Sequence, residues 1–261
     1  MSIESALARL QHRLPVLHAG HVWLAGAGPG DPGLLTLDVI SALDQADAIV
    51  HDALVSEEII ALADHAEKFF VGKRGGRLSI PQGDINALLV RLAKEGRKVV
   101  RLKGGHPLVF ARGAEEALAL VAEQIPYRVL AGVTSAFGGL TSAGIPATMR
   151  GVNGAIILAT GFAADSDDRP NWTALARTGQ PIVIYMGLTH MEQTITQLHA
   201  GGLSPDTPAA MVENATLPHE RTVVATLGTL IEAAKREKVV SPALIVIGGI
   251  VALREKLGRT G

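Results

Sequence analysis

The chain has 261 residues, a formal net charge of −1 and no cysteine. Its near-neutral charge gives no reason to expect non-specific binding to nucleic acid, and the lack of cysteine excludes disulfides and thiolate metal ligands. Hydrophobic residues make up 48% of the chain, but no apolar run reaches the roughly 18–20 residues of a membrane span. The N-terminal segment contains charged side chains instead of the apolar core of a secretory signal, so we expect a cytoplasmic protein.

In the first half of the chain, apolar runs of strand length alternate with segments of helical period. An N-terminal extension, residues 1–19, is expected to form an amphipathic helix. The elements predicted after it are strand Val22–Ala25, a helix over 35–46, strand Ala48–Val50, a helix capped by Asp84 and ended by Gly96, strand Val99–Leu102, helix Ala114–Glu123 and strand Tyr127–Leu130. Strands that alternate with helices predict βαβ units and a largely parallel sheet.

The second half repeats this theme less regularly. Its predicted strands are Ala155–Ala159, Ile182–Tyr185, Ala209–Val212, Val223–Leu227 and Ala243–Ile247. Two of them have no clear helix between them, which favours a mixed sheet. The glycine-rich stretch Ala131–Gly144 is the expected boundary, so we predict an N-terminal α/β lobe over 20–133 and a C-terminal α/β lobe over 134–261. Ligands of such α/β folds bind where loops gather at the carboxyl ends of strands, here in a cleft between the lobes.

A glycine-rich loop, Gly26-Ala-Gly-Pro-Gly-Asp-Pro-Gly33, follows the first predicted strand. A dinucleotide fingerprint beginning at Gly26 would carry its third glycine at position 31, but the chain has Asp31, whose carboxylate repels a pyrophosphate. The two prolines also remove N–H donors. A nicotinamide-dependent oxidoreductase is therefore disfavoured, while a plain turn and a loop for a ligand without phosphate stay open.

The segment GAGPGDPGLLT at 26–36 resembles the opening signature of the tetrapyrrole methylase family. Further segments match this family in order: HDALV at 51–55, VGKRGG at 71–76, VVRLKGGHPLVFARGAEE at 99–116, GVTSA at 132–136, AGIPATMRG at 143–151, YMG at 185–187, TPAAMVENA at 207–215 and SPALIVIG at 241–248. The strings KRGG, RLKGG, GIPATMR and YMG resemble the branch of the family that methylates uroporphyrinogen III.

This resemblance implies a two-lobed α/β fold, a homodimer, no metal, and S-adenosyl-L-methionine bound in the cleft between the lobes and released as S-adenosyl-L-homocysteine. It also implies methylation of uroporphyrinogen III at C2 and C7, giving precorrin-2 by way of precorrin-1 for cobalamin, sirohaem or related tetrapyrroles. A methylase of a later precorrin intermediate is an alternative with the same fold. A cofactor-binding protein without catalysis is a further alternative.

The resemblance also implies which residues form the site. The matches to cofactor positions are Pro29, Gly104, Gly105, His106, Val109, Thr134, Ser135, Met186, Ala215 and Ala243. For Met186, core packing beside Tyr185 is the alternative. Asp52 matches a candidate base, with helix capping as its alternative. Lys73 matches a position proposed as an acid, and a solvated surface lysine is its alternative.

Uroporphyrinogen carries carboxylate arms, and arginine is the side chain best suited to pair with them. The candidate substrate-binding residues are Arg74, Arg77, Arg112, Glu115 and Arg150. Arg112 is also a candidate for proton transfer. We interpret Arg128 as a solvated surface residue.

The chain departs from the family pattern in its longest signature, which usually reads GGDPF followed by Gly-Arg-Gly-Gly. His106 stands in place of the Asp, Leu108 in place of the Phe, and Ala111 and Ala114 in place of glycines. Losing a carboxylate near a sulfonium weakens cofactor binding, unless the contact is made through the backbone. We adopt the second hypothesis for His106. Ala53 and Gly249 also differ, standing where many members carry Arg and Glu.

Overall fold

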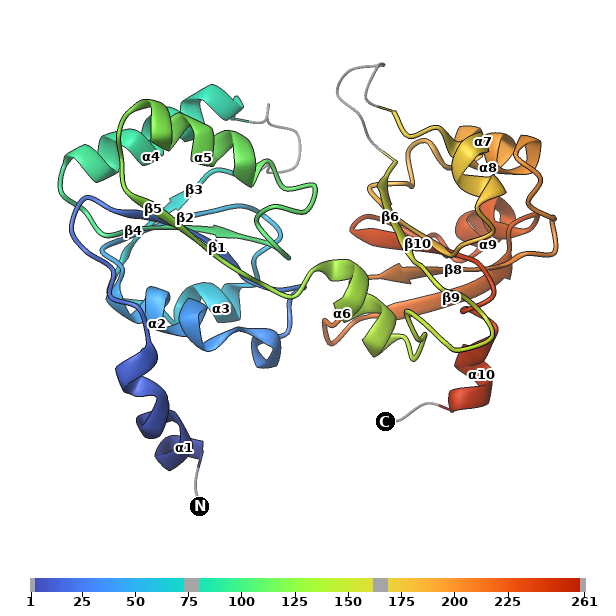
Figure 1. Cartoon of the computed structure of the whole chain (residues 1–261), viewed down its shortest axis with the longest axis horizontal. Coiled ribbons are helices and arrows are strands. Elements are labelled where there is room, and N and C mark those ends of the chain that lie inside the picture. Colours follow the sequence, from blue (N-terminus) through green and yellow to red (C-terminus); the bar gives the residue numbers. More distant parts are fainter. Residues whose placement is uncertain (1–2, 73–79, 162–168, 259–261) are drawn as a thin grey trace. The chain divides into compact units, whose positions relative to one another are not determined.

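The structure is a computed structural model that describes residues 3–72, 80–161 and 169–258 (Figure 1). The chain divides into two compact units, Met1–Thr134 and Ser135–Gly261. Each unit contains one five-stranded sheet flanked by helices, which confirms the predicted fold class of two α/β lobes. No helix within the described residues is long and apolar enough to cross a membrane.

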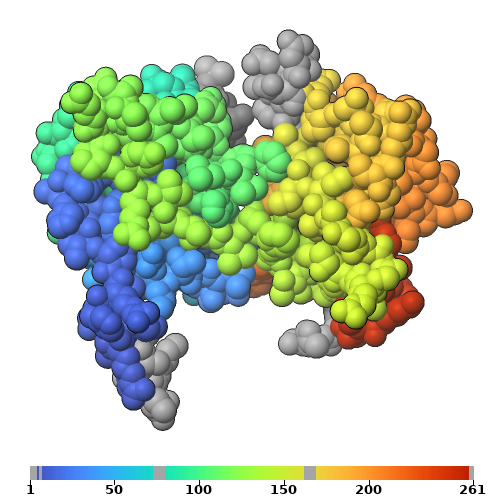
Figure 2. Space-filling view, in the orientation of Figure 1, coloured from blue at the N-terminus to red at the C-terminus, as the bar shows by residue number. Residues whose placement is uncertain are grey.

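Unit 1 is built on a fully parallel sheet. Its elements are α1 (Ile3–Leu10), the 3-10 helix η1 (Gln11–Arg13), β1 (Val22–Gly26), the 3-10 helix η2 (Pro32–Leu34), α2 (Leu37–Gln45), β2 (Ala48–His51), α3 (Glu57–Ala61), β3 (Glu67–Phe70), α4 (Gln82–Lys94), β4 (Val99–Lys103), α5 (Gly113–Ala122) and β5 (Tyr127–Leu130). The strand order is β3-β2-β4-β1-β5, and every neighbouring pair is parallel. Helix α1 projects from the body of this unit (Figures 1 and 2).

Helices cover both faces of the unit 1 sheet, with α2 and α3 on one face and α4 and α5 on the other (Figure 1). On β4, Val100 and Leu102 belong to the core cluster that includes α2 and α3. Val99 instead belongs to the cluster with Leu89 of α4 and Leu120 of α5. Full burial of such a side chain stabilises the fold by about 1.5–3 kcal/mol, and burial on both faces explains why these strands are apolar runs.

The start of α4 differs from the prediction. Its N-cap is Pro81, with no side-chain cap, so the expected cap at Asp84 is wrong. Asp84 lies in the first turn instead, where a carboxylate stabilises the positive end of the helix dipole. The predicted stop is confirmed, because Gly96 adopts a positive φ of 78° directly after the C-cap Glu95, the left-handed conformation that ends many helices.

Unit 2 contains a mixed sheet, as predicted. Its elements are α6 (Ser135–Ser142), β6 (Ile157–Thr160), α7 (Trp172–Arg177), β7 (Ile182–Tyr185), α8 (Met191–Ala200), β8 (Pro208–Glu213), β9 (Arg221–Thr226), α9 (Leu230–Arg236), β10 (Ala243–Ile247) and α10 (Leu253–Leu257). The order is β6-β7-β10-β8-β9. β6 and β7 pair in parallel, whereas β10 pairs antiparallel with both β7 and β8. β8 and β9, which have no helix between them, also pair antiparallel.

The glycine-rich stretch 131–144 contains helix α6, which the sequence does not predict because glycine is a poor helix former. Packing explains the glycine at its centre. A Cβ atom added at Gly139 would lie 2.8 Å from Leu244 Cδ1 and 3.0 Å from Ala215 Cβ. Glycine therefore lets α6 approach β10 closely, and this tertiary contact outweighs the low helical propensity.

Three glycines make the backbones of unit 1 meet at the carboxyl ends of its central strands. Gly26 ends β1, Gly105 lies just after β4, and Gly132 lies just after β5. A Cβ atom at Gly26 would lie 2.5 Å from Gly105 O and 2.7 Å from Gly132 N, and one at Gly132 would lie 2.5 Å from Gly26 O. These clashes are with backbone atoms, so no side-chain movement relieves them.

We therefore expect Gly132→Ala to lower the free energy of unfolding by about 3 kcal/mol, the upper end of overpacking effects. The matched control is Gly83→Ala in α4, where an added Cβ meets nothing within 4 Å and removal of a helical glycine adds about 0.5–1 kcal/mol. Urea denaturation measures both changes. Equal stability of Gly132→Ala and the unsubstituted chain would contradict the proposed crowding.

Candidate active site

The loops after β1 and β4 are joined by backbone hydrogen bonds at the carboxyl edge of the unit 1 sheet. Gly28 N donates to Gly105 O at 3.2 Å, and Gly105 N donates to Gly28 O at 2.6 Å. Both glycines have φ near 70°, a conformation that glycine adopts without strain. The edge therefore presents backbone groups closely, with Pro29 half-buried beside them.

The carboxylate of Asp31 turns back onto its own loop. Its Oδ1 accepts a hydrogen bond of 2.7 Å from Gly33 N, and Asp31 is the N-cap of η2. The Asp31 carboxylate thus already accepts the hydrogen bond of an amide at the start of this short helix. A bound pyrophosphate would need that amide and would face a negative charge, so the loop geometry agrees with the sequence argument against a dinucleotide.

The loop after β4 carries the departures from the family signature. His106 Nδ1 accepts a hydrogen bond of 3.1 Å from Leu108 N, and Val109 N donates to His106 O at 3.2 Å. An Asp carboxylate at position 106 would accept from the same amide, as in an Asx turn. The imidazole therefore supplies the turn contact that the family's Asp would supply, with its ring proton on Nε2. A Cβ atom added at Gly104 would lie 2.8 Å from Leu54 Cβ, so Gly104 packs closely against Leu54.

Asp52 directly follows β2 and is held from two sides. Its Oδ1 accepts from Leu54 N at 3.0 Å, and its Oδ2 lies 3.7 Å from Arg101 Nη2. The side chain is 26% exposed, so it is oriented but still accessible. The helix-cap alternative is wrong, because the N-cap of α3 is Ser56. The Ser56 hydroxyl donates instead to Gly30 O at 3.2 Å, which links the loop after β2 to the first glycine loop.

Arg112 and Glu115 form a bidentate ion pair at the start of α5. Arg112 Nε donates to Glu115 Oε1 at 2.8 Å, and Nη2 donates to Oε2 at 2.6 Å. The hydrogen bonds to Arg112 lower the pKa of Glu115 and raise that of Arg112. Arg112 also adopts a positive φ of 58°, which costs a non-glycine residue about 1–3 kcal/mol. The side chains are 57% and 50% exposed, so the pair is open to solvent.

The other candidate residues, most of them in unit 2, lie in loops or at the ends of helices and strands. Met186 follows β7, has a positive φ of 52° and is 49% exposed, which rules out core packing as its role. Ala215 lies between Asn214 and Thr216, both also with positive φ. Strained backbone at several non-glycine positions is typical of functional loops. Of the remaining candidates, Thr134 is buried, Ser135 begins α6, Ala243 begins β10 and Arg150 is exposed.

Five of the unit 1 candidates lie at the same edge of the sheet. Pro29, Asp52, Gly104, Gly105 and His106 all lie in loops at the carboxyl edge of the parallel sheet. Lys73, Arg74 and Arg77 lie outside the residues that the structure describes. Arg128 lies over the Trp23 ring, 5.7 Å from its centroid, and 3.9 Å from Asp38 Oδ2, on an exposed surface as interpreted from the sequence.

Sequence reasoning missed three buried charged residues on β4 and α5, close to this edge of the sheet. Arg101 and Lys103 of β4 are each 3% exposed, and Glu116 of α5 is fully buried. Burial lowers the pKa of Lys103, and the neighbouring charge of Arg101 adds to this effect. The available signal was the pair of cations two residues apart in the otherwise apolar string VVRLK, because residues i and i+2 of a strand share one face.

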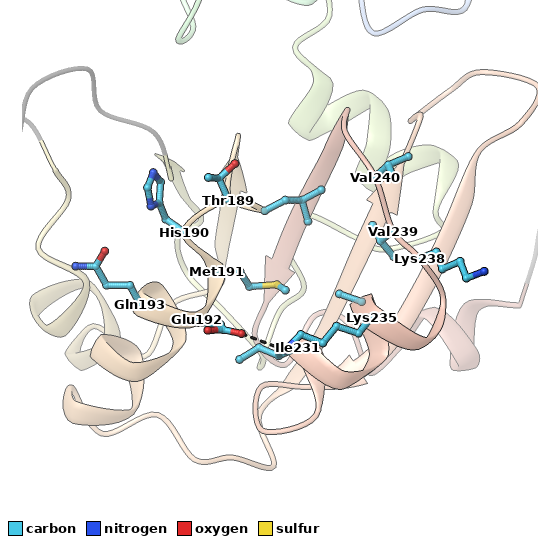
Figure 3. A pocket seen from close by; sticks show the side chains of 12 residues that line it. Thr189, His190, Met191, Glu192, Gln193, Ile231, Lys235, Lys238, Val239 and Val240 are labelled. Carbon is cyan, nitrogen blue, oxygen red and sulfur yellow. Dashed lines mark hydrogen bonds and ion pairs between the residues drawn. The ribbon is translucent and has the colours of Figure 1, made fainter. Parts of the chain in front are cut away.

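A cavity of about 630 Å³ in unit 2 contains none of these candidates (Figure 3). It lies beside α8 and α9, and an ion pair of 3.2 Å between Glu192 Oε1 and Lys235 Nζ crosses it. Both of these side chains are exposed, so their charges are screened by water. Among the residues described, no group of His, Cys, Asp and Glu is arranged to hold a metal ion.

Comparison with known proteins places these observations in a family. The family described as Tetrapyrrole (Corrin/Porphyrin) Methylases matches residues 21–231. A uroporphyrinogen-III C-methyltransferase from Sinorhizobium sp is 48% identical over 251 residues, 95% of this chain and 90% of that protein. A siroheme synthase from Neisseria meningitidis serogroup B is 49% identical over 93% of this chain, but the chain spans only 50% of that protein.

A solved structure shows the same fold. The crystal structure of a uroporphyrin-III C-methyl transferase from Thermus thermophilus, complexed with S-adenyl homocysteine, matches with a TM-score of 0.77 and 38% sequence identity. The match covers 89% of this chain and 99% of that chain.

The exposed ion pair predicts a small, pH-dependent stability effect. We expect Glu115→Gln to lower the free energy of unfolding by at most about 1 kcal/mol near neutral pH. Because the folded-state pKa of Glu115 is depressed, this contribution is present above the unfolded-state pKa and is lost as pH falls through the folded-state value. Urea denaturation across this pH range, at low and high salt, measures it. A loss that persists in acid would contradict the ion-pair origin.

Proposed function

The chain belongs to the tetrapyrrole (corrin/porphyrin) methylases, and from this membership we propose that it transfers methyl groups from S-adenosyl-L-methionine to uroporphyrinogen III. The observation that carries the proposal is the 48% identity to a uroporphyrinogen-III C-methyltransferase over nearly the whole of both chains. The Thermus thermophilus relative with bound S-adenyl homocysteine supports the choice of methyl donor.

We further propose methylation at C2 and C7, giving precorrin-2 by way of precorrin-1. The product would serve sirohaem, cobalamin or another modified tetrapyrrole. The match to siroheme synthases covers only half of their length, so their complete activity is not carried over. A homodimer in the cytoplasm remains part of the proposal, on the family resemblance alone.

The glycine edge of unit 1 fits a donor that carries no phosphate. Gly26 and Gly132 leave no room for side chains against the backbone oxygen of Gly105, so backbone amides and carbonyls are presented for contact. When bound, S-adenosyl-L-methionine supplies the electrophilic methyl group. The residues proposed to hold it are Pro29, Gly104, Gly105, His106, Val109, Thr134, Ser135, Met186, Ala215 and Ala243.

Asp52 is proposed to act as the base at the pyrrole carbon that accepts the methyl group. Attack by an electron-rich pyrrole carbon builds positive charge on the ring, and a proton must leave afterwards. A fixed carboxylate stabilises that charge and accepts the proton. Asp52 has the required features, since Leu54 N orients one oxygen while the side chain stays 26% exposed. Lys73 is retained as the candidate acid.

Arginines are proposed to bind the carboxylate arms of the substrate. Arg112 and Arg150 are both exposed, and a guanidinium pairs with a carboxylate through two parallel hydrogen bonds. Glu115 already occupies Arg112 in this way. A substrate carboxylate that binds the Nε–Nη2 side of Arg112 must therefore displace Glu115, whereas the Nη1–Nη2 edge of the guanidinium provides a second pair of donors. Arg74 and Arg77 complete the proposed set.

Three alternatives make different predictions. A methylase of a later precorrin intermediate would leave uroporphyrinogen III unchanged. A nicotinamide-dependent oxidoreductase would bind NAD(P)H, which the self-bonded carboxylate of Asp31 disfavours. A cofactor-binding protein without catalysis would bind the donor and show no turnover.

The proposal is tested by incubating the purified chain with S-adenosyl-L-methionine and uroporphyrinogen III under anaerobic conditions. We expect mass spectrometry to show the macrocycle gaining two methyl groups, through a species with one. The Asp52→Asn variant removes the carboxylate charge but keeps the size of the side chain. Its rate of methylation should be about 10²–10⁴-fold lower. Donor binding without any methylated macrocycle would overturn the proposed function.

The hydrogen bond of His106 makes a second prediction. Because Leu108 N already has an acceptor in His106 Nδ1, we expect His106→Asp to preserve the turn and to change the dissociation constant for S-adenosyl-L-homocysteine by less than tenfold, about 1.4 kcal/mol. His106→Ala removes the acceptor and should weaken binding more than His106→Asp does. Titration calorimetry measures both variants. A tighter binding of tenfold or more in His106→Asp would show that the missing carboxylate matters electrostatically.

A further inference from the structure

Three buried charges lie beneath α5, on a face of the unit 1 sheet that is otherwise apolar. Arg101 and Lys103 are on β4, and Glu116 is on α5. Removing each charge from water costs several kcal/mol, and apolar residues of similar size often stabilise a fold as well or better. Fold stability therefore gives no sufficient reason for this cluster, and its contacts indicate what it does.

Glu116 gathers three donors onto one oxygen. Its Oε1 accepts from Arg101 Nε at 3.0 Å, Lys103 Nζ at 2.9 Å and Gln82 Nε2 at 3.3 Å. Its Oε2 is buried and has no hydrogen-bond partner among the described residues. This single carboxylate holds together two cations that would otherwise repel one another. Burial lowers the pKa of Lys103, and the neighbouring charge of Arg101 lowers it further.

Hydrogen bonds hold two of the three guanidinium nitrogens of Arg101. Its Nη1 donates to the carbonyl oxygens of Val50 at 3.2 Å and Leu102 at 3.1 Å, while its Nε donates to Glu116. A guanidinium is planar, so these bonds define the plane of the whole group. The remaining nitrogen, Nη2, lies 3.7 Å from Asp52 Oδ2. Glu116 and the two carbonyl oxygens thus together set where the positive charge that faces Asp52 lies.

We infer that Glu116 is a positioning residue that acts through Arg101 on the carboxylate of Asp52, with Lys103 and Gln82 holding Glu116 in place. The inference rests on the proposed function, in which Asp52 is the base at the methyl-accepting carbon. Arg101 restrains Oδ2 of Asp52 by charge at a distance too long for a hydrogen bond, so this oxygen keeps a lone pair for the reacting ring. Leu54 N restrains the other oxygen.

The first variant is Glu116→Gln, which keeps the side-chain volume and removes the negative charge. We expect kcat to fall by about tenfold to a hundredfold, the effect of a small misplacement of a reacting group. KM for uroporphyrinogen III and the dissociation constant of S-adenosyl-L-homocysteine should change by less than about threefold, since Glu116 is buried and contacts neither in this scheme. Glu95→Gln, which breaks the exposed Arg91–Glu95 pair, is the matched control and should leave all three constants unchanged.

A double-mutant cycle separates positioning from a general structural effect. If Glu116 acts through Asp52, then Glu116→Gln should lower kcat by less than about twofold when Asp52→Asn is already present, because coupled sites are not additive. An equal loss of kcat in both backgrounds overturns the inference. No loss of kcat in the single variant also overturns it.

A milder variant tests the same inference if Glu116→Gln does not fold. Gln82→Leu removes one donor to Glu116 from the half-buried start of α4, and circular dichroism verifies its fold. We expect a fall in kcat of about threefold that disappears in the Asp52→Asn background; unchanged kcat overturns the inference. Failure of the proposed function is distinguishable, because the unsubstituted chain would then methylate nothing.

Discussion

The carbonyl oxygen of Gly105 lies so close to Gly26 and Gly132 that no side chain fits at either position. This constraint brings the ends of β1, β4 and β5 together, and the loops that follow them inherit their places from it. Asp31 and Ser56 then close the same edge with hydrogen bonds to Gly33 N and Gly30 O. Unit 1 therefore presents a rim of closely packed backbone groups, which suits a reaction that depends on placing a methyl donor.

Local sequence pattern predicted the central strands of both units, because strands buried on two faces are apolar runs bounded by turn residues. It failed where tertiary contacts decide. Strand β3, Glu67–Phe70, lies at the sheet edge and is only partly buried, so it lacks an apolar run. Helix α6 forms despite its glycines because Gly139 packs against Leu244. The cap of α4 was misplaced since Asp84 suits a first turn as well as a cap.

The sequence predicts candidate residues in the loops but does not identify the buried charged residues that contact them. Family motifs identify Asp52 and His106, but they do not say that Leu108 N binds the imidazole or that Arg101 faces the carboxylate. Which face of β4 carries its cations, and that Glu116 meets them there, depends on how α5 packs, and a single strand pattern does not contain that information. Met186 likewise becomes accessible through a left-handed backbone that its residue type does not favour.

Lys103 joins the two features that define the site. Its backbone oxygen accepts a hydrogen bond of 2.7 Å from Ala27 N in the first glycine loop, while its side-chain nitrogen donates to Glu116 at 2.9 Å. The end of β4 therefore connects the proposed donor rim to the carboxylate that holds Arg101. A shift of this strand end would move the rim and the charge facing Asp52 together, so the proposed donor and base positions are set by one element. A buried charge cluster at this point has a cost in desolvation, and the inferred positioning of Asp52 accounts for that cost.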